Sequence, residues 1–330
     1  MANPKITVLM SVYNGQDLLS EAIHSILNQS YNDFEFLIID DGSTEPLDDL
    51  SERYKDKRIV VLRQENMGLT RSLNKGFALA RGQYVARMDA DDVSSTKRLE
   101  AQVNELDTDD RLDLVGCFFD VIDREDRLVE RKELITDPVY RLWRLQFHNN
   151  YGHGTVMLRR KAVISAGLYN EDLTYAQDYD LWSRLSRKDN TMIIPEVLYS
   201  YRLVENSMQA SVKNYDVQLA TALGVSNRNL TACKPGLTER ECGEIRALYW
   251  KCGYDSISTG AVKLLSSLLE GFCTRFGIDN DERSRLAQNI ASDLIVEVEK
   301  TEDLGSNDKK KIIEQALSLA VGESDALSKQ

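Results

Sequence analysis

Apolar runs of strand length alternate with amphipathic stretches through the first third of the chain. The strand-like runs occupy residues 6–12, 34–39, 59–62 and 83–87. Between them, apolar side chains recur with helical spacing over residues 18–27 and 69–80. Because these strands are too uniformly apolar to leave one face in water, the order predicts a mainly parallel sheet with helices on both faces.

Beyond residue 95 the alternation loosens. The pattern predicts a helix over 98–106, a strand over 114–122 followed by a hairpin turn at 123–126, a strand over 155–158 and a helix over 177–185. From about residue 214 onward helical periodicity dominates, with a break at 305–307. We therefore expect an α/β domain over residues 1–210, with halves 1–110 and 111–210, and a helical carboxyl-terminal appendage over 211–330.

Composition and charge narrow the classes of protein. The chain has 330 residues, 42% of them hydrophobic, and a formal net charge of -12, which argues against nucleic-acid binding. The five cysteines include no Cys-x-x-Cys pair, so a zinc site or a disulfide framework is not expected. Residues 1–5 lack a signal-peptide pattern and no apolar run approaches the roughly 20 residues of a membrane span. We expect a cytoplasmic protein, with peripheral contact at the inner face of the membrane left open.

Polar and acidic residues follow three of the predicted strands. They are residues 11–14, Asp40-Asp41-Gly42-Ser43 and Asp89-Ala90-Asp91-Asp92. The carboxyl ends of parallel strands form the ligand-binding edge of such sheets, so these segments should converge on one cleft. Carboxylates there suit a divalent cation that holds a diphosphate. A solvated loop with a helix cap, or a plain Asp-Gly turn, is the alternative for each segment taken singly.

Taken in order, these and further segments resemble the inverting nucleotide-sugar glycosyltransferases of family 2, which have the GT-A fold. The matching segments are Ser11-Val12-Tyr13-Asn14-Gly15, residues 26–31, Asp40-Asp41-Gly42-Ser43, Asn66-Met67-Gly68-Leu69, Leu73-Asn74-Lys75-Gly76, residues 80–84, Asp89-Ala90-Asp91-Asp92, His153-Gly154-Thr155, residues 167–171, Gln177-Asp178-Tyr179-Asp180-Leu181-Trp182 and Tyr201-Arg202. The resemblance covers roughly residues 4–210. Each segment is weak evidence by itself, whereas the ordered set is specific.

The resemblance implies a role for each matching residue. Asp178 would be the general base that removes the acceptor proton, on the face opposite the leaving nucleotide. Asp92, with Asp91, would hold Mn2+ or Mg2+ on the diphosphate, and Asp91 would also face the ribose. Residues that would contact the nucleotide are Ser11, Val12, Tyr13, Asn14, Asp41, which would meet the uracil, and Arg71, which would steady the diphosphate.

Several of these residues keep a plain structural alternative. For Asp178 the alternative is a helix cap, which is compatible with the role of base. Arg71 is as readily a surface arginine, and His153 either lines the acceptor cleft or is structural. Asp89 is expected to support the acidic loop or to contact the nucleotide less directly, and Arg202 is expected to support the site or contact the acceptor. The chain has Gln177 where many relatives have Glu, and Leu203 and Val204 follow Arg202 where relatives often have His, so supporting contacts from these two places are in doubt. Trp143 and Tyr151 suit either a sugar face or a core.

The expected activity is transfer of a hexose or N-acetylhexosamine from a UDP-sugar to a hydroxyl of a glycan or lipid-linked oligosaccharide. The resemblance points to bacterial capsule, O-antigen or exopolysaccharide synthesis, and a homo-oligomer is compatible with it. The rivals are a sugar-nucleotidyltransferase, which would need a Gly-rich basic loop after the first strand that Tyr13-Asn14-Gly15-Gln16-Asp17 does not supply, and a non-catalytic scaffold acting through the carboxyl-terminal helices.

Overall fold

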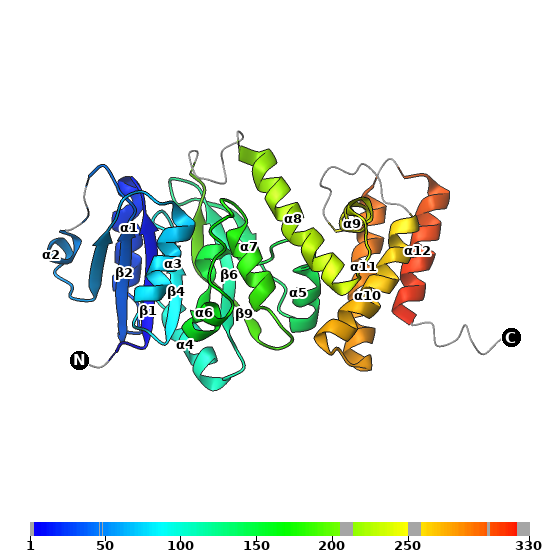
Figure 1. Cartoon of the computed structure of the whole chain (residues 1–330), viewed down its shortest axis with the longest axis horizontal. Helices are drawn as coiled ribbons and strands as arrows, with labels where there is room; N and C mark the ends of the chain where they lie inside the picture. Colours follow the sequence, from blue (N-terminus) through cyan, green and yellow to red (C-terminus); the bar gives the residue numbers. More distant parts are fainter. Residues whose placement is uncertain are drawn as a thin grey trace. The chain divides into compact units, whose positions relative to one another are not determined.

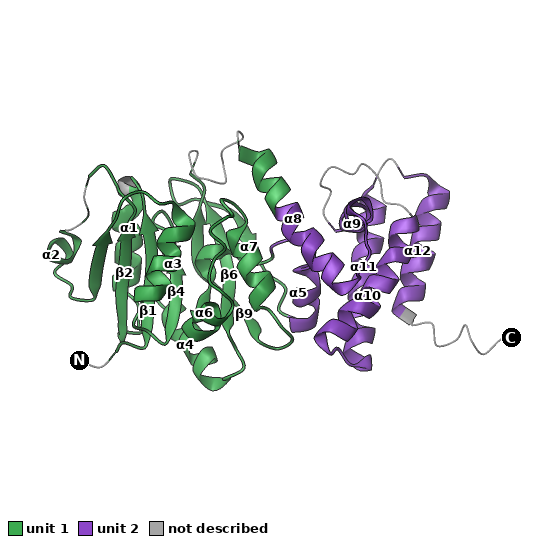
Figure 2. Cartoon of the chain, in the orientation of Figure 1, with its two compact units in different colours: residues 1–136, 150–221 green, residues 137–149, 222–330 purple. Residues whose placement is uncertain are grey.

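A computed structural model shows the fold of the chain (Figure 1). It describes residues 3–45, 47, 49–204, 214–249, 259–301 and 304–321. The chain divides into two compact units: unit 1 comprises residues 1–136 and 150–221, and unit 2 comprises residues 137–149 and 222–330 (Figure 2).

Unit 1 is built on one mixed sheet. Its strands are β1 (Ile6–Val12), β2 (Phe34–Asp40), β3 (Ile59–Arg63), β4 (Tyr84–Met88), β5 (Val93–Ser94), β6 (Leu114–Ile122), β7 (Leu128–Lys132), β8 (Met157–Arg159) and β9 (Thr191–Arg202). Among the described residues their order is β3-β2-β1-β4-β8-β6-β9-β5, with β7 paired to β6. Strands β1 to β4 are mutually parallel, β8 is antiparallel to β4 and β6, and β9 is parallel to β6. The predicted mixed, mainly parallel α/β sheet is confirmed.

Helices cover both faces of this sheet. They are α1 (Gln16–Leu27), α2 (Leu50–Tyr54), α3 (Leu69–Leu79), α4 (Arg98–Thr108), α6 (Arg160–Ser165) and α7 (Gln177–Leu185), with a short 3-10 turn at His153–Thr155. The apolar stripes of α1 and α4, represented by Ile23 and Val103, share a buried core with Val8 of β1. On the other face α3 lies directly against β1, because a Cβ at Gly76 would stand only 2.2 Å from Cδ1 of Leu9.

Unit 2 is helical. It contains α5 (Pro138–Arg144), most of α8 (Tyr215–Cys233), and α9 (Glu239–Arg246), α10 (Thr259–Phe276), α11 (Asn280–Lys300) and α12 (Ser306–Val321). Capping boxes, in which an N-cap side chain and a Glu three residues later bond each other's backbone, start α9 and α11. The predicted helical region is therefore confirmed. In the described parts of the chain, no helix combines the length and apolarity needed to cross a membrane.

The division differs from the predicted one at two places. The boundary falls at residue 221 and not near 210, and residues 137–149, expected in the 111–210 half of the α/β domain, belong to the helical unit. The reason is the apolar side of α5, since Trp143 and Phe147 are fully buried among the helices of unit 2. Polar contacts fix the same helix: Nη1 of Arg144 lies 2.8 Å from Oδ2 of Asp293, and Nε1 of Trp143 donates to the Tyr249 hydroxyl at 3.1 Å.

Candidate active site

The acidic loop 89–92 follows β4, and its last carboxylate points into the protein. Asp92 is 1% exposed; its Oδ2 accepts a hydrogen bond from the Tyr199 hydroxyl at 2.7 Å, and its Oδ1 accepts one from the backbone N–H of Arg202 at 2.8 Å. Burial first, and then the neighbouring charge of Asp91, raise the pKa of Asp92 to about 7. Asp92 thus ties the loop to β9.

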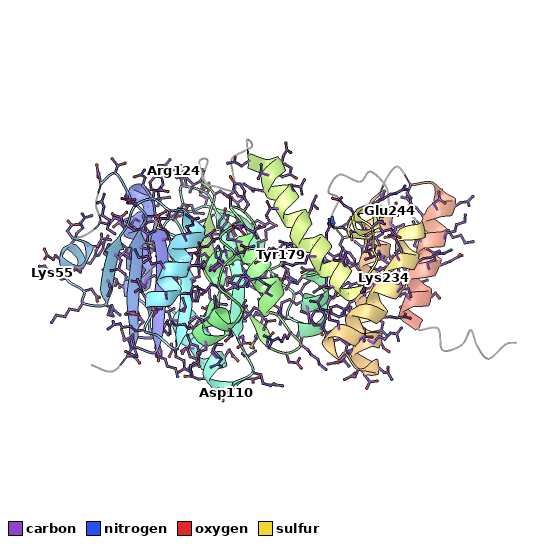
Figure 3. All side chains as sticks on the ribbon, in the orientation of Figure 1. Lys55, Asp110, Arg124, Tyr179, Lys234 and Glu244 are labelled. Carbon is purple, nitrogen blue, oxygen red and sulfur yellow. The ribbon has the colours of Figure 1, made fainter. Side chains whose placement is uncertain are left out.

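Arg202, predicted as a support, holds the same loop from the end of β9. Its Nε donates to the backbone carbonyl of Asp91 at 2.9 Å, and its Nη2 lies 2.8 Å from Glu21 on α1. Its Nη1 pairs with Asp126 at 2.5 Å, in the β6–β7 turn that also carries Arg124 (Figure 3). This guanidinium is 1% exposed, so three separate segments meet on one buried cation.

Asp89 and Asp91 are the carboxylates of the loop that solvent reaches. Both are partly exposed, and burial is the main cause that raises the pKa of Asp91. Asp89 forms an ion pair with Arg87 of β4. Three or more His, Cys, Asp or Glu side chains in metal-binding proximity do not occur within the described segments. Two carboxylates still fit a divalent ion of the Mg2+ class, since such ions are commonly held by one or two carboxylates together with substrate phosphates.

Asp41, at the end of β2, is 2% exposed and anchors the loop that precedes α3. Its Oδ1 accepts hydrogen bonds from Nε2 of Gln64 at 2.7 Å and from the backbone N–H of Met67 at 2.9 Å. Its Oδ2 accepts one from the N–H of Gly68 at 2.9 Å. A carboxylate oxygen accepts about two hydrogen bonds, so Oδ2 retains capacity for one further donor.

The residues of the predicted nucleotide-binding segment at the end of β1 differ in their exposure to solvent. Val12 is 1% exposed and Ser11 is partly buried, whereas the Tyr13 side chain is 57% exposed. Asn14 has a left-handed backbone with φ of 53°, and its side-chain Oδ1 accepts from the N–H of Thr44 at 2.8 Å. Asn14 therefore fastens the ends of β1 and β2 together, and Tyr13 is the ring that this edge presents.

Asp178 lies in the first turn of α7, the helix that also carries Tyr179 (Figure 3). Its side chain is partly exposed, whereas Gln177 is 7% exposed. The preceding residue, Ala176, adopts a left-handed φ of 52°, which turns the chain sharply into the helix. Asp180 is 1% exposed and pairs with Arg184 at 2.7 Å, so its carboxylate serves the helix itself.

Two aromatic side chains pack against Trp182 of α7. Nε2 of His153 is 2.9 Å from the hydroxyl of Tyr169, and both rings contact Trp182. Burial, followed by the charge of Arg87, holds the pKa of His153 well below its usual value, so the ring is neutral at pH 7. Burial raises the pKa of Tyr169, and the carboxylate of Asp178 adds to that rise. Asp178 and Arg87 therefore act on the same Tyr169 ring.

Trp143 and Tyr151, which suited either a sugar face or a core, are packed. Trp143 is 0% exposed in the core of unit 2, and Tyr151 is 6% exposed with its hydroxyl 3.0 Å from Oγ1 of Thr191. Lys309, Lys310 and Lys311 lie in the first turns of α12 and are exposed or partly exposed, as a solvated helix start requires.

Arg71, predicted to meet the diphosphate, pairs with Glu171 at 3.4 Å, and both side chains are about half exposed. The neighbouring Asn74 makes a firmer link that sequence reasoning left without a role. Its Nδ2 donates to the carbonyl of Tyr169 at 3.0 Å, and its Oδ1 accepts from the N–H of Tyr169 at 3.0 Å. Helix α3 thereby holds the loop that leads to α7.

Tyr199 and Arg87 were also missed as parts of this site. Tyr199 carries no signal in the sequence, because nothing predicts that it faces Asp92. Arg87 does carry a signal in the sequence, because it is a charged residue within a strand that is buried along its whole length.

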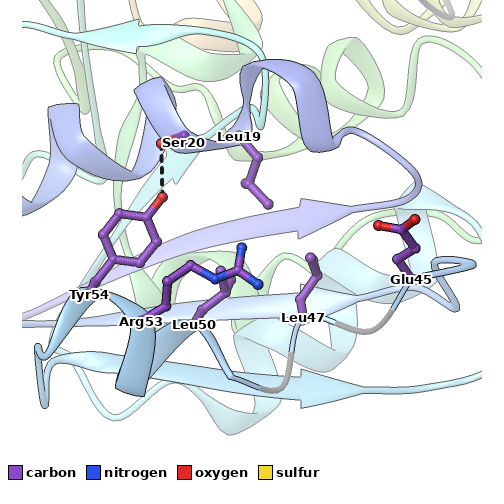
Figure 4. Close-up of a pocket in the computed structure, with 7 residues that line it drawn as sticks. All are labelled: Leu19, Ser20, Glu45, Leu47, Leu50, Arg53 and Tyr54. Carbon is purple, nitrogen blue, oxygen red and sulfur yellow. Dashed lines mark hydrogen bonds between the residues drawn. The ribbon is translucent and has the colours of Figure 1, made fainter.

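A cavity of about 210 Å³ lies on the flank of unit 1, between α1 and α2 (Figure 4). It is lined by Leu19, Ser20, Glu45, Leu47, Leu50, Arg53 and Tyr54. The Tyr54 hydroxyl donates to Oγ of Ser20 at 3.0 Å across it. It contains none of the predicted site residues, so we assign it no part in the site.

Comparison with known proteins gives this arrangement a family. The model of glycosyl transferase family 2 matches residues 7–166. An uncharacterized glycosyltransferase from Haemophilus influenzae is 33% identical over 246 residues, which are 69% of this chain and 74% of that protein. The amylovoran biosynthesis glycosyltransferase AmsE from Erwinia amylovora is 29% identical over 59% of this chain and 75% of its own.

Solved structures show the same fold. TarS residues 1–349 from S. aureus, in complex with UDP-GlcNAc, superpose with a TM-score of 0.57 at 15% identity, covering 96% of this chain and 90% of that one. The mannosyltransferase PcManGT from Pyrobaculum calidifontis, in complex with GDP-Man and Mn2+, gives a TM-score of 0.54 at 15% identity, covering 98% and 89%.

Proposed function

The chain belongs to glycosyl transferase family 2, and from that premise we propose that it transfers a hexose or N-acetylhexosamine from a UDP-sugar to a glycan hydroxyl, with inversion at the anomeric carbon. The observation that carries the proposal is the buried ring of Tyr169, which contacts Trp182 of α7 and which the charges of both Arg87 and Asp178 influence. Arg87 is the ion-pair partner of Asp89, so this ring links the acidic loop 89–92 to the start of α7, and the loop and Asp178 would be the two acidic poles of the site. An inverting transfer needs these two poles.

At the first pole, Asp91 with Asp89 would hold a Mn2+ or Mg2+ ion against the donor diphosphate. When bound, that ion neutralises negative charge on the departing nucleotide. Asp92 was the preferred ligand from the sequence, but both of its oxygens accept hydrogen bonds inside the protein. We therefore propose Asp91 as the principal ligand and Asp92 as the residue that fixes the loop.

At the second pole, Asp178 would accept the proton of the attacking hydroxyl. Its carboxylate is partly exposed, as a base that meets an incoming acceptor must be, and the buried Gln177 beside it brings no second negative charge. Asn74 and the αL turn at Ala176 fix the loop and helix start from which Asp178 projects.

The donor base follows from the hydrogen bonds of Asp41. Uracil presents a single N–H donor on its edge, and Oδ2 of Asp41 retains capacity for one donor. Guanine presents two kinds of donor on that edge and would need both oxygens, one of which already accepts two bonds. The complex of TarS with UDP-GlcNAc supports the uridine donor, whereas the mannosyltransferase complex with GDP-Man shows that this fold also accepts guanosine.

The acceptor that we propose is a hydroxyl of a growing bacterial surface glycan, in soluble or lipid-linked form. The relative named for amylovoran biosynthesis supports this class. A lipid-linked acceptor would bring the protein to the cytoplasmic face of the membrane as a peripheral protein.

The test is release of UDP from UDP-glucose, UDP-galactose, UDP-GlcNAc and UDP-GalNAc in Mn2+, with thermal stabilisation by each nucleotide measured in parallel. Asp178→Asn should abolish UDP release and keep UDP binding. Asp172→Asn, an exposed carboxylate of the loop before α7, is the matched control and should turn over normally. Normal turnover by Asp178→Asn removes that residue from the mechanism, and release of pyrophosphate in place of UDP identifies a nucleotidyltransferase.

A further inference from the structure

A second cavity, of about 610 Å³, lies in unit 1 at the edge of the sheet where β1 and β4 begin. Five of the ten residues that line it are cationic, namely Lys5, Arg81, Arg159, Arg160 and Lys161. The chain as a whole is acidic, with a formal net charge of -12. A cluster of cations around one cavity of such a chain concentrates positive potential there and favours an anionic ligand.

This cavity is at the opposite end of the strands from the acidic loop. Strands β1 and β4 are parallel; Lys5 and Gln83 directly precede them, whereas the loop 89–92 follows β4. At about 3.3 Å per residue, the five residues of β4 put roughly 15 Å between the two places. An anion in the cavity is therefore a second ligand, separate from the nucleotide sugar of the proposed site.

Two of the five cations already have close carboxylate partners. Nζ of Lys5 lies 2.7 Å from Asp107, and Nη2 of Arg81 lies 2.5 Å from Glu35. Asp33, the one carboxylate of the lining, accepts a hydrogen bond from the backbone N–H of Lys5 at 3.3 Å. Lys5 and Arg81 thus add little net charge, and the positive potential comes from the other three cations.

Those three, Arg159, Arg160 and Lys161, are consecutive and are not neutralised in the same way. Nε of Arg159 donates to the carbonyl of Leu112 at 3.0 Å, and Nε of Arg160 donates to the carbonyl of Phe77 at 2.9 Å. The carboxylates in reach of Arg159 are 3.9 Å away, and among the described residues neither Arg160 nor Lys161 forms an ion pair. Carbonyl partners fix a guanidinium in place and leave its charge uncompensated.

The same three cations are accessible to a ligand. The Arg159 side chain is 15% exposed, Arg160 is partly exposed and Lys161 is exposed. The buried ring of Tyr84 brings Lys5 next to them, since Nζ of Lys5 is 5.2 Å and Cζ of Arg159 is 5.3 Å from its centroid. Because the two guanidiniums are already held by carbonyls, a ligand would lose little affinity to the ordering of these side chains.

We propose that this cavity binds a phosphate-bearing anion through the guanidiniums of Arg159 and Arg160 and the ammonium of Lys161. The planar fork of a guanidinium matches two phosphate oxygens, and an ammonium adds a point charge. The volume is within the roughly 300–1,000 Å³ of small-molecule sites, so it accommodates a diphosphate or a phosphorylated headgroup. The phosphate is carried either by an anionic lipid or by a free molecule, and the site does not depend on the proposed transferase activity.

Two probes, used with the full chain in EDTA, distinguish these sources. Calorimetry measures the Kd for pyrophosphate, and sedimentation measures binding to vesicles of phosphatidic acid and phosphatidylcholine in equal parts, with phosphatidylcholine vesicles as the blank. In Arg160→Gln we expect the Kd for pyrophosphate to rise about ten-fold, as loss of a hydrogen bond to a charged group predicts. In Lys161→Gln, which removes an exposed charge, we expect a rise of about three-fold.

Lys263→Gln is the matched control, because it removes an exposed lysine on α10 of unit 2 and should leave both probes unchanged. Arg160 also bonds the backbone at the end of α3, so its variant can lose stability. If Arg160→Gln fails to fold, Lys161→Gln carries the test, since Lys161 is exposed.

The pattern of binding assigns the source. Binding of pyrophosphate without vesicles identifies a free phosphate ligand, and binding of vesicles, with or without pyrophosphate, identifies a lipid headgroup, provided that the two variants weaken it. Two results overturn the proposal: a wild type that binds neither probe, and variants at Arg160 and Lys161 that bind as the wild type does. Neither result affects the proposed function, which the release of UDP tests separately.

Discussion

The acidic loop 89–92 offers the sharpest test of the site, because we assign a structural role to Asp92 and a metal-binding role to its neighbour Asp91. Replacement of Asp92 by Ala deletes the acceptor of two buried donors, the Tyr199 hydroxyl and the Arg202 N–H. Replacement of Asp91 by Asn alters a partly exposed carboxylate that is hydrogen-bonded by its own backbone N–H. We expect the first change to act mainly on folding and the second mainly on metal-dependent nucleotide binding.

The size of the first effect follows from the two orphaned donors. A buried donor left without a partner costs about 1–3 kcal/mol, so Asp92→Ala should lower the free energy of unfolding by roughly 2–5 kcal/mol. Relief of repulsion with Asp91, which contributes to the raised pKa of Asp92, offsets part of this cost. For a unit of this size each kcal/mol shifts the Tm by about 2–4 °C, so a fall of roughly 4–20 °C is expected. Asp92→Asn keeps an acceptor oxygen and should lose less.

Thermal unfolding and UDP calorimetry, each with Mn2+ and with EDTA, distinguish the two assignments. Asp91→Asn should keep the wild-type Tm, weaken UDP binding in Mn2+ and leave binding in EDTA unchanged. Asp92→Ala should show the lower Tm and, at temperatures where it is folded, a smaller loss of the Mn2+ effect. A wild-type Tm and a lost Mn2+ effect in Asp92→Ala, together with a retained Mn2+ effect in Asp91→Asn, would contradict both assignments.

Three further changes test other parts of the structure. Asn74→Ala removes both hydrogen bonds to the Tyr169 backbone, so turnover of UDP-sugar should fall about ten-fold while the Kd for UDP stays within about two-fold; a parallel loss of both would show that Asn74 serves the nucleotide. Burial lowers the pKa of His148 in the folded state, so the unfolded state binds the extra proton and stability should fall as pH drops below about 6.5. His148→Gln should reduce that dependence in urea unfolding at pH 7.5 and 5.5 and leave the part that the buried His153 contributes, and an unchanged slope would exclude His148 as a cause. In Gly82→Ala a Cβ would stand 2.4 Å from the backbone N of Thr7, so soluble yield should collapse, whereas Gly224→Ala in α8, where a Cβ meets nothing within 4 Å, should leave it intact.

The local pattern of apolar and polar residues was enough to predict most elements of the first half of the α/β domain, residues 1–110. Strands β1, β2 and β3 and helices α1 and α3 lie where apolar runs and helical spacing predicted them. Both faces of a parallel sheet are buried, so its strands appear in the sequence as continuous apolar runs. Strand β9, with the sequence TMIIPEVLYSYR, was not predicted, since a proline and alternating polar residues hide it. Its pairing with β6 depends on contacts about 80 residues apart, which periodicity does not report.

The domain boundary shows a similar limit. Residues 137–149 lie between two strands of the α/β unit, and sequence order alone assigns them to it. Burial decides otherwise, because Trp143 and Phe147 join the core of unit 2. A helix of seven residues carries too little periodicity to reveal which of two cores it will join.

The order of the motifs identified candidate site residues, namely Asp41, Asp89 to Asp92 and Asp178. It did not indicate which of two adjacent carboxylates would bind a ligand. Asp91 and Asp92 are the same residue type, so the local sequence does not distinguish them. They differ in the structure because Tyr199 and Arg202, about 110 positions away in the sequence, donate hydrogen bonds to Asp92. These two donors make Asp92 a structural acceptor, and for this reason Asp91 is the carboxylate that we propose for the metal. The charge of Arg87 was visible in the strand sequence, but its ion pair with Asp89 is seen only in the structure. When candidate site residues are adjacent in the sequence, the hydrogen bonds that each side chain already makes within the protein determine which side chain is available to a ligand.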